Sequence, residues 1–136
     1  MWRNILAVAG GLTVFALVGG ILGAVRMALH ESYGVAEDSH LMGMAHCGLS
    51  MLCSGFIIGL ASTRKHVITS LIVFTALIAA WGILLFAAFP QLWELASADE
   101  KQLLMLGAYY IVGLLFLATG AWLGVRVRYR VTSRKG

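Results

Sequence analysis

Residues 67–89 read VITSLIVFTALIAAWGILLFAAF and contain no charged side chain. A helix rises 1.5 Å per residue, and a bilayer core about 30 Å thick needs roughly 20 apolar residues, so this stretch is long enough to cross it. Apolar runs of this length without alternation predict helices rather than barrel strands. The fold class expected is therefore an all-α integral membrane protein, a four-transmembrane-helix bundle. Its expected spans are Ile5–Val25, Leu41–Ser62, Val67–Phe89 and Leu103–Val125.

The composition excludes a water-soluble domain. Of the 136 residues, 60% are apolar and 12% are charged, whereas soluble chains carry about 25% charged residues. The longest segment outside the expected spans, 26–40, has 15 residues, which is too few for a separate domain. The sequence predicts a single membrane domain over residues 1–136, with the lipid bilayer as its surroundings.

The charged residues are divided between the two ends of the expected spans. Eight of the ten Lys and Arg residues lie at one end, and all six acidic residues lie at the other. The positive-inside rule makes the basic end cytoplasmic, so both termini are expected to be cytoplasmic in a multi-pass protein of the cell (inner or plasma) membrane. Topology and attraction to anionic lipid account for the basic surplus, so no nucleic-acid partner is expected. The basic end holds Arg3, Arg64, Lys65, Arg126, Arg128, Arg130, Arg134 and Lys135.

The first expected span could also be a cleaved secretory signal. Signal peptides have an apolar core of about 7–15 residues, whereas the run from Ile5 to Val25 has 21 residues. The length favours a retained helix. Cleavage would leave three spans.

Pairs of glycines four residues apart occur in three of the expected spans. Such pairs let two helices approach closely, either within one chain or between chains. They are consistent with a homo-oligomer or with a subunit of a larger membrane complex. The third span has only Gly82 and is expected to be the most exposed to lipid. The pairs are Gly19 and Gly23, Gly55 and Gly59, and Gly120 and Gly124.

Histidine and sulfur side chains are concentrated toward the acidic end, which is the expected outer side. His46 lies about five residues inside the second span, where a polar ionisable side chain is costly and marks a candidate functional site. Imidazole and thioether groups are ligands for haem iron and Cu(I). We therefore expect His46 to be a cofactor or metal ligand, with His40 or His30 as the second. The alternative is a hydrogen-bonded histidine that packs between helices.

Aromatic residues lie at a depth similar to that of His46. By the rise of 1.5 Å per residue, His46 lies about 8 Å below the outer end of its span, and Trp81, Tyr109 and Tyr110 lie about 9–12 Å below the outer ends of theirs. A haem or a quinone head group could lie among them, with the Tyr hydroxyl and the Trp N–H as polar contacts. Ordinary packing or contact with lipid is the alternative. Cys47 and Cys53 are six residues apart, about 120° around a helix, and are not expected to form a disulfide.

Two stretches resemble the first two helices of haem-copper oxidase subunit I. They are GGILGAVRMAL at residues 19–29 and HLMGMAHCGLSM at residues 40–51, joined by an acidic loop. The chain is also similar to short membrane proteins that keep only this His-bearing part of the oxidase. The resemblance implies that His46 is the low-spin haem ligand, that Arg26 ends the first helix, and that Met51 is the methionine after the ligand.

The resemblance covers about a quarter of the chain and has two departures from the family pattern. Cys47 stands where the family has glycine. The third and fourth spans contain no histidine, so they supply neither the second haem ligand nor the copper ligands of the family. Oxygen reduction is therefore not expected, nor is any independent catalytic activity.

Three functions remain open from the sequence. The leading hypothesis is a small membrane subunit for haem binding or electron transfer in a respiratory-type complex, with Met51, Tyr109 and Trp81 near the His46 ligand. The second is a non-catalytic accessory or assembly subunit that packs on a larger complex. The third is a small transporter of a soft metal ion, for which the inner halves of the spans offer few polar groups.

Overall fold

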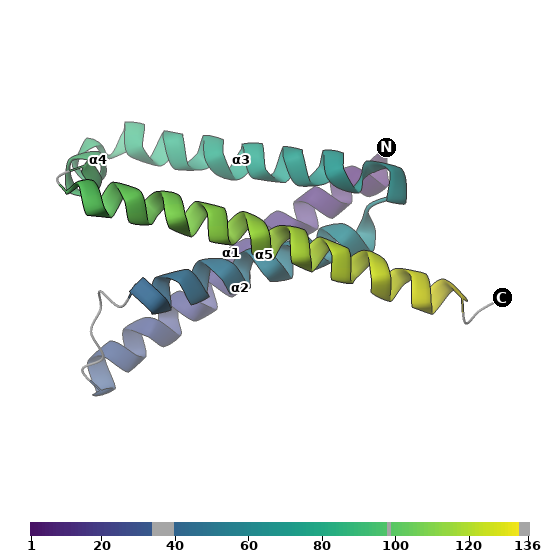
Figure 1. Ribbon diagram of the computed structural model, residues 1–136, viewed down its shortest axis with the longest axis horizontal. Helices are drawn as coiled ribbons and strands as arrows, with labels where there is room; N and C mark the ends of the chain where they lie inside the picture. The colour runs from purple at the N-terminus through teal and green to yellow at the C-terminus, as the bar shows by residue number, and fades with distance from the viewer. Residues whose placement is uncertain (34–39, 98, 134–136) are drawn as a thin grey trace.

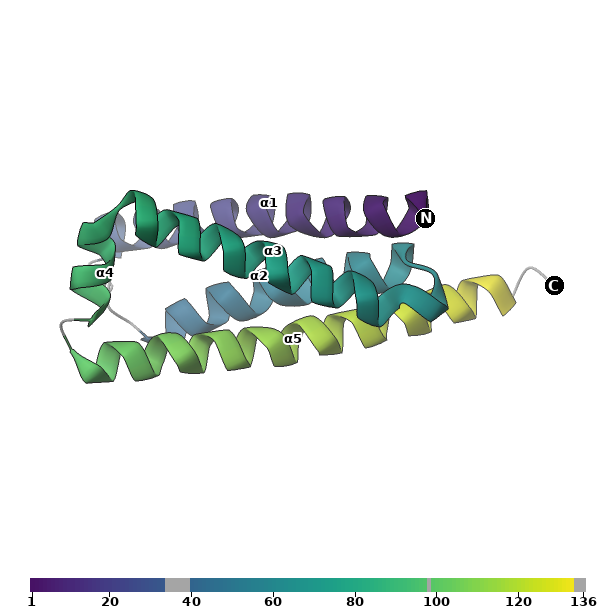
Figure 2. The same cartoon turned by 90° about the horizontal axis from the view of Figure 1, so that it is seen from above.

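The computed structural model describes residues 1–33, 40–97 and 99–133, and nearly all of them are helical. Four helices, α1, α2, α3 and α5, are long and apolar enough to cross a membrane, which confirms the four predicted long apolar helices. Both termini and the α2–α3 connection lie at one end of the bundle, and α4 lies at the other (Figures 1 and 2). The elements are α1 Trp2–Tyr33, α2 His40–Ala61, the 3₁₀ turn η1 Arg64–His66, α3 Val67–Ala88, α4 Pro90–Ser97 and α5 Glu100–Ser133.

The first and last helices are longer than the apolar runs that predicted them. α1 has 32 residues and α5 has 34, which corresponds to about 48 and 51 Å at 1.5 Å per residue. Both exceed a hydrocarbon core of about 30 Å. α5 continues past its apolar part through Arg126, Arg128 and Arg130, so these guanidinium groups are carried on a helix rather than on an irregular tail.

The connection at the acidic end is more ordered than expected. Its residues form α4, whose Trp93 ring meets Phe86 of α3 edge-on, with centroids 5.8 Å apart. In the sequence, Ser97-Ala-Asp-Glu100 has the pattern of a capping box, which predicts that the last helix begins just after Ser97. This prediction is wrong, because Ser97 ends α4 and α5 begins at Glu100. The cap of α5 is instead Asp99, whose Oδ1 accepts a hydrogen bond from the Lys101 backbone N–H at 3.1 Å.

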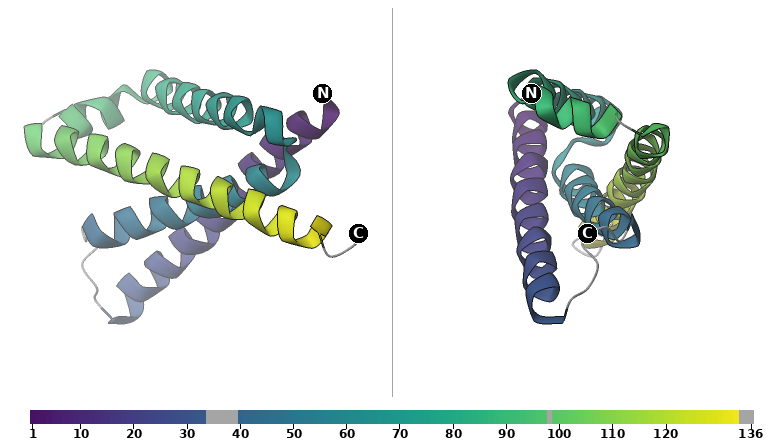
Figure 3. Two further views of the ribbon diagram at one scale, coloured as in Figure 1. Left: turned by 45° about the vertical axis from the view of Figure 1, so that its right-hand side comes forward. Right: turned by 90° about the vertical axis from the view of Figure 1, so that its left-hand side faces the viewer.

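α2 lies at the centre of the bundle, between α1 and α5 (Figure 3). Its most extensive packing is against α5, through two of the predicted glycine pairs. A Cβ added to Gly55 would collide with the Leu117 carbonyl oxygen, and one added to Gly120 with that of Leu52. The same holds for Gly59 and Gly124 against neighbouring backbone. Both pairs therefore serve packing within the chain.

The apolar core joins α2 and α5 to α3. Its buried members are Met51, Ile58, Phe74 and Leu117, and the Phe74 ring meets Phe15 of α1 edge-on at 6.2 Å between centroids. Elsewhere α3 makes little contact, since only 6% of its apolar window is buried, against 33% for α2. Of the four long helices α3 is thus the least buried, in line with the expectation that the third span is the most exposed.

Two arginines close the end of α2 at the basic end of the bundle. Arg3 of α1 donates to the Ala61 carbonyl oxygen at 3.5 Å, and Arg128 of α5 donates to the carbonyl oxygen of the buried Ser62. The last carbonyl groups of a helix have no partner within the helix and carry partial negative charge. The two guanidinium groups satisfy them and fasten the first and last helices to the same point.

The turn that follows α2 is held by a second set of hydrogen bonds. Asn4 Oδ1 accepts from the backbone N–H of Thr63 at 3.2 Å and from its hydroxyl at 3.4 Å. Ser62 and Ser70 share a buried hydroxyl–hydroxyl bond of 3.0 Å. The turn thus has polar partners from α1 and α3, as a connection near lipid requires.

Candidate cofactor site around His46

His46 lies on the face of α2 that meets α1, and its side chain is half-buried. A Cβ placed on Gly19 would be 3.6 Å from His46 Nε2, and one on Gly23 would be 3.7 Å from Cε1. The imidazole ring therefore lies along α1 over these two glycines. The first predicted glycine pair provides the space that this ring occupies, rather than a contact between two bare helices.

The hydroxyl groups next to His46 are bound to backbone. Ser50 Oγ donates to the His46 carbonyl oxygen at 2.9 Å, and Ser54 Oγ donates to the Ser50 carbonyl at 2.7 Å. Within the part of the chain that the structure describes, the imidazole nitrogens of His46 form no hydrogen bond. In lipid an unpaired polar group carries a free-energy cost, so this ring calls for a polar partner from outside these residues.

Met51 does not share the face of His46. It is 4% exposed, belongs to the core, and its Cγ would be 3.4 Å from a Cβ on Gly113 of α5. Five residues along a helix correspond to a rotation of about 140°, which is why the two side chains diverge.

Tyr109 packs on the α5-facing side of α2. A Cβ on Gly43 would be 3.3 Å from the Tyr109 hydroxyl oxygen. The Tyr109 backbone carbonyl accepts a weak hydrogen bond from Cys47 Sγ at 3.8 Å. Cys47 and Cys53 are both free thiols, as their angular separation predicts.

The other two aromatic residues of the predicted layer face elsewhere. Tyr110 lines a groove between α3 and α5, and Trp81 of α3 is 62% exposed. These rings were grouped only by their expected depth, and the structure does not bring them together around His46. The contacts of His46 are with α1, those of Tyr109 with α2, and those of Tyr110 with the α3–α5 groove.

The predicted second ligands fall at the acidic end. His30 is exposed in the last turn of α1 and has an interaction partner, as does the half-buried Arg26. His40 begins α2, but its side chain lies outside the described residues. Among residues 1–33, 40–97 and 99–133, no group of three His, Cys, Asp or Glu side chains could hold a metal ion. Of the three histidines whose side chains are described, His30 is exposed at the end of α1 and His66 is exposed in η1, so His46 alone lies away from a helix end.

Two features of the structure were missed by the sequence reasoning. One is the fit of Tyr109 and Cys47 against Gly43 and Gly113, which had no signal beyond the presence of the glycines. The other is a cavity at the basic end beside Trp122, for which the alternation of arginine and aromatic residues after residue 121 was an available signal. No protein-family model, curated protein or solved structure matches this chain, so its function is argued from its residues.

Proposed function

We propose that the chain is a small multi-pass subunit of the cell membrane that contributes the His46 imidazole as one axial ligand of a haem or electron-transfer centre. The observation that carries the proposal is an imidazole at membrane depth whose nitrogens have no hydrogen-bond partner in the described residues. The resemblance of residues 40–51 to the haem-ligating helix of haem-copper oxidases supports the same role. A bound haem would supply one-electron transfer.

The chain's own residues would fix the orientation of the ligand. Gly19 and Gly23 leave room for the ring along α1, and Ser50 keeps its hydroxyl on the His46 carbonyl rather than on the ring. The second axial ligand would come from His40, from His30 or from a second chain. An incomplete ligand set fits a subunit better than a protein that acts alone.

The proposal also includes the orientation in the membrane. Most of the arginines lie at the end that holds both termini, and Glu31, Glu94, Asp99 and Glu100 lie at the opposite end. By the positive-inside rule the termini are cytoplasmic and His46 lies in the outer half of the bilayer.

Optical spectra of the purified chain, oxidised and reduced, test the haem proposal. After reconstitution with haem we expect a Soret band that shifts on reduction. The substitution His46→Gln should abolish the band, whereas His66→Gln at the basic end and Met51→Leu in the core should leave it. A chain without any Soret band after reconstitution with haem would contradict the proposal.

A second candidate is an accessory subunit that acts by packing alone. It is favoured by the fit of the His46 ring over Gly19 and Gly23, which is also what a packing histidine would show. Here His46→Gln would leave assembly and activity of the parent complex unchanged. Substitutions at Gly55 or Gly120 would not separate the candidates, because these glycines are buried within the chain itself. Recovery of an active complex with His46→Gln would therefore favour this candidate over the first.

A further inference from the structure

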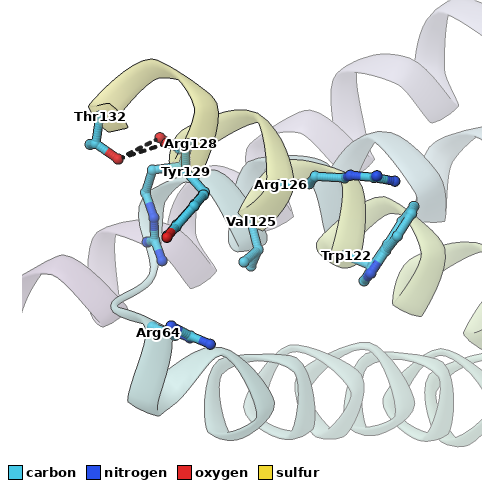
Figure 4. A pocket seen from close by; sticks show the side chains of 7 residues that line it. All are labelled: Arg64, Trp122, Val125, Arg126, Arg128, Tyr129 and Thr132. Carbon is cyan, nitrogen blue, oxygen red and sulfur yellow. Dashed lines mark hydrogen bonds between the residues drawn. The ribbon is translucent and has the colours of Figure 1, made fainter. Parts of the chain in front are cut away.

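A cavity of about 380 Å³ lies at the basic end of the bundle, between η1 and the last turns of α5. Arg64 extends from η1 toward α5, and Arg128 and Tyr129 lie opposite it (Figure 4). Arg126 borders the cavity and stacks over the Trp122 ring, with the guanidinium carbon 4.9 Å from the ring centroid. Two separate elements thus bring three arginines to the border of one cavity, with the Arg126 guanidinium turned toward Trp122 (Figure 4).

The positive charge of this cavity has no counterpart nearby. The acidic residues in the described ranges are Glu31, Glu94, Asp99 and Glu100, and all lie at the other end of the bundle. Arg128 uses one nitrogen on the Ser62 carbonyl, which is a neutral acceptor. Guanidinium groups bind phosphate oxygens through paired, charge-assisted hydrogen bonds. The cavity is therefore suited to a phosphate group.

A separate apolar groove lies further along α3 and α5. It has a volume of about 430 Å³ and is lined by residues from Ile68 to Ala79 of α3 and from Tyr110 to Ala118 of α5. Ile68 comes four residues after Arg64, and Ala118 comes four residues before Trp122, so the groove begins one helical turn from the arginines.

The length of the groove matches one leaflet. Ile68 and Ala79 are 11 residues apart, which is about 16 Å along the helix. Half of a hydrocarbon core of about 30 Å is about 15 Å. Trp122 and Tyr129 line the cavity at the basic end, where amphipathic rings are found at membrane surfaces.

We propose that the seam between α3 and α5 binds an anionic phospholipid, with its phosphate among Arg64, Arg126 and Arg128 and one acyl chain in the apolar groove. The uncompensated charge selects an anionic head group over a zwitterionic one. The apolar groove one helical turn away favours a lipid over a free phosphate. The head-group site and the acyl-chain groove are both independent of the function proposed for His46.

Native mass spectrometry of the full chain in detergent tests the proposal. Phosphatidylglycerol and phosphatidylcholine with the same acyl chains are compared with glycerol 3-phosphate and inorganic phosphate. We expect retention of phosphatidylglycerol at least tenfold above phosphatidylcholine, and no retention of the two soluble phosphates. Equal retention of both lipids would overturn the proposal, and so would displacement of the lipid by inorganic phosphate, which would indicate a free-phosphate site.

Matched variants distinguish this site from general attraction to a basic surface. Arg64 contacts the phosphate in this proposal, and a charge-assisted hydrogen bond is stronger than attraction at a distance, so Arg64→Gln should weaken retention of phosphatidylglycerol at least about tenfold. Arg130→Gln removes one charge outside the cavity and should lose only the long-range attraction, about fivefold at most. An equal loss with Arg130→Gln would overturn the proposal, because it would mean that only the net charge matters.

The groove has its own pair of variants. Ala118→Phe should fill the groove and lower retention of phosphatidylglycerol about tenfold with the arginines intact, whereas Ala80→Phe, on α3 outside the groove, should not. Thermal unfolding of each variant without added lipid checks that the fold is kept. Lipid retention unchanged by Ala118→Phe, or a dimer that excludes lipid from the seam, would overturn the proposal.

Discussion

Gly120 of α5 rests directly on the carbonyl oxygen of Leu52 of α2, so closely that a single added methyl group would collide with it. Gly55 has the same relationship to Leu117 from the other side. The two helices therefore approach backbone to backbone at their centre. Close approach of this kind maximises van der Waals contact, which is the main source of helix association in lipid.

Gly120→Ala should destabilise the folded chain by about 1–3 kcal/mol, because the backbone of α2 must move to admit the methyl group. Unfolding in detergent by increasing SDS, followed by circular dichroism, would measure this. Gly107→Ala is the matched control, since nothing lies within 4 Å of a Cβ at Gly107 of the same helix. The control should be neutral or slightly stabilising. Equal losses of stability at both positions would contradict the close contact between α2 and α5 at Gly120.

Arg128→Gln should loosen the basic end of the bundle. The guanidinium donates to the Ser62 carbonyl, and a hydrogen bond from a charged donor contributes about 1.5–3 kcal/mol. Its loss should raise amide hydrogen exchange in the turn at residues 62–66, read by mass spectrometry of peptic peptides. Arg130→Gln makes the same change at an exposed position, and comparable exchange in both variants would count against the assigned contact.

Gly113 and Cys47 should be energetically coupled. A Cβ on Gly113 would be 3.2 Å from the Cys47 sulfur, so Gly113→Ala should cost about 1 kcal/mol of stability through overpacking. In the Cys47→Ala background the sulfur is gone and the added methyl group fills its space. The double variant should then be more stable than the sum of the single effects by at least about 0.5 kcal/mol, and strict additivity would argue against the contact.

Gly19→Leu should displace the His46 ring. A Cβ at Gly19 would be in ordinary contact with the ring at 3.6 Å, so Gly19→Ala should be tolerated, whereas a longer side chain cannot share the space. Gly20→Leu is the control, because a Cβ there has nothing within 4 Å. Thermal unfolding should show a loss for Gly19→Leu that His46→Ala partly restores. A loss that His46→Ala leaves unchanged would mean that the ring lies elsewhere.

The helices could be predicted because hydropathy alone determines them. The expected span Val67–Phe89 and the helix Val67–Ala88 differ by one residue. The helical ends of α1 and α5 could not be predicted in the same way, since their charged residues extend beyond the apolar runs that mark a span. α4 was missed because eight residues of mixed polarity between spans are indistinguishable from a loop.

The positions of His46, Tyr109 and Trp81 along their helices could be predicted from the sequence, but the directions of their side chains could not. The direction of each side chain depends on how its helix is rotated about its axis. For α2 and α5 this rotation follows from the close contact of their glycine pairs. Met51 could have been separated from His46 by its five-residue spacing alone, because side chains on one helix face recur every three or four residues.

The central position of α2 has a consequence for how the protein is made. Its principal partner is α5, the last helix in the chain, and chains are synthesised from the N-terminus. The glycine face of α2 is therefore synthesised well before α5, which covers it. Until then, α2 can pack only on α1 and α3. During synthesis the chain therefore passes through a stage with three helices in which the glycine face of α2 is uncovered, and α5 completes the packing only when it arrives.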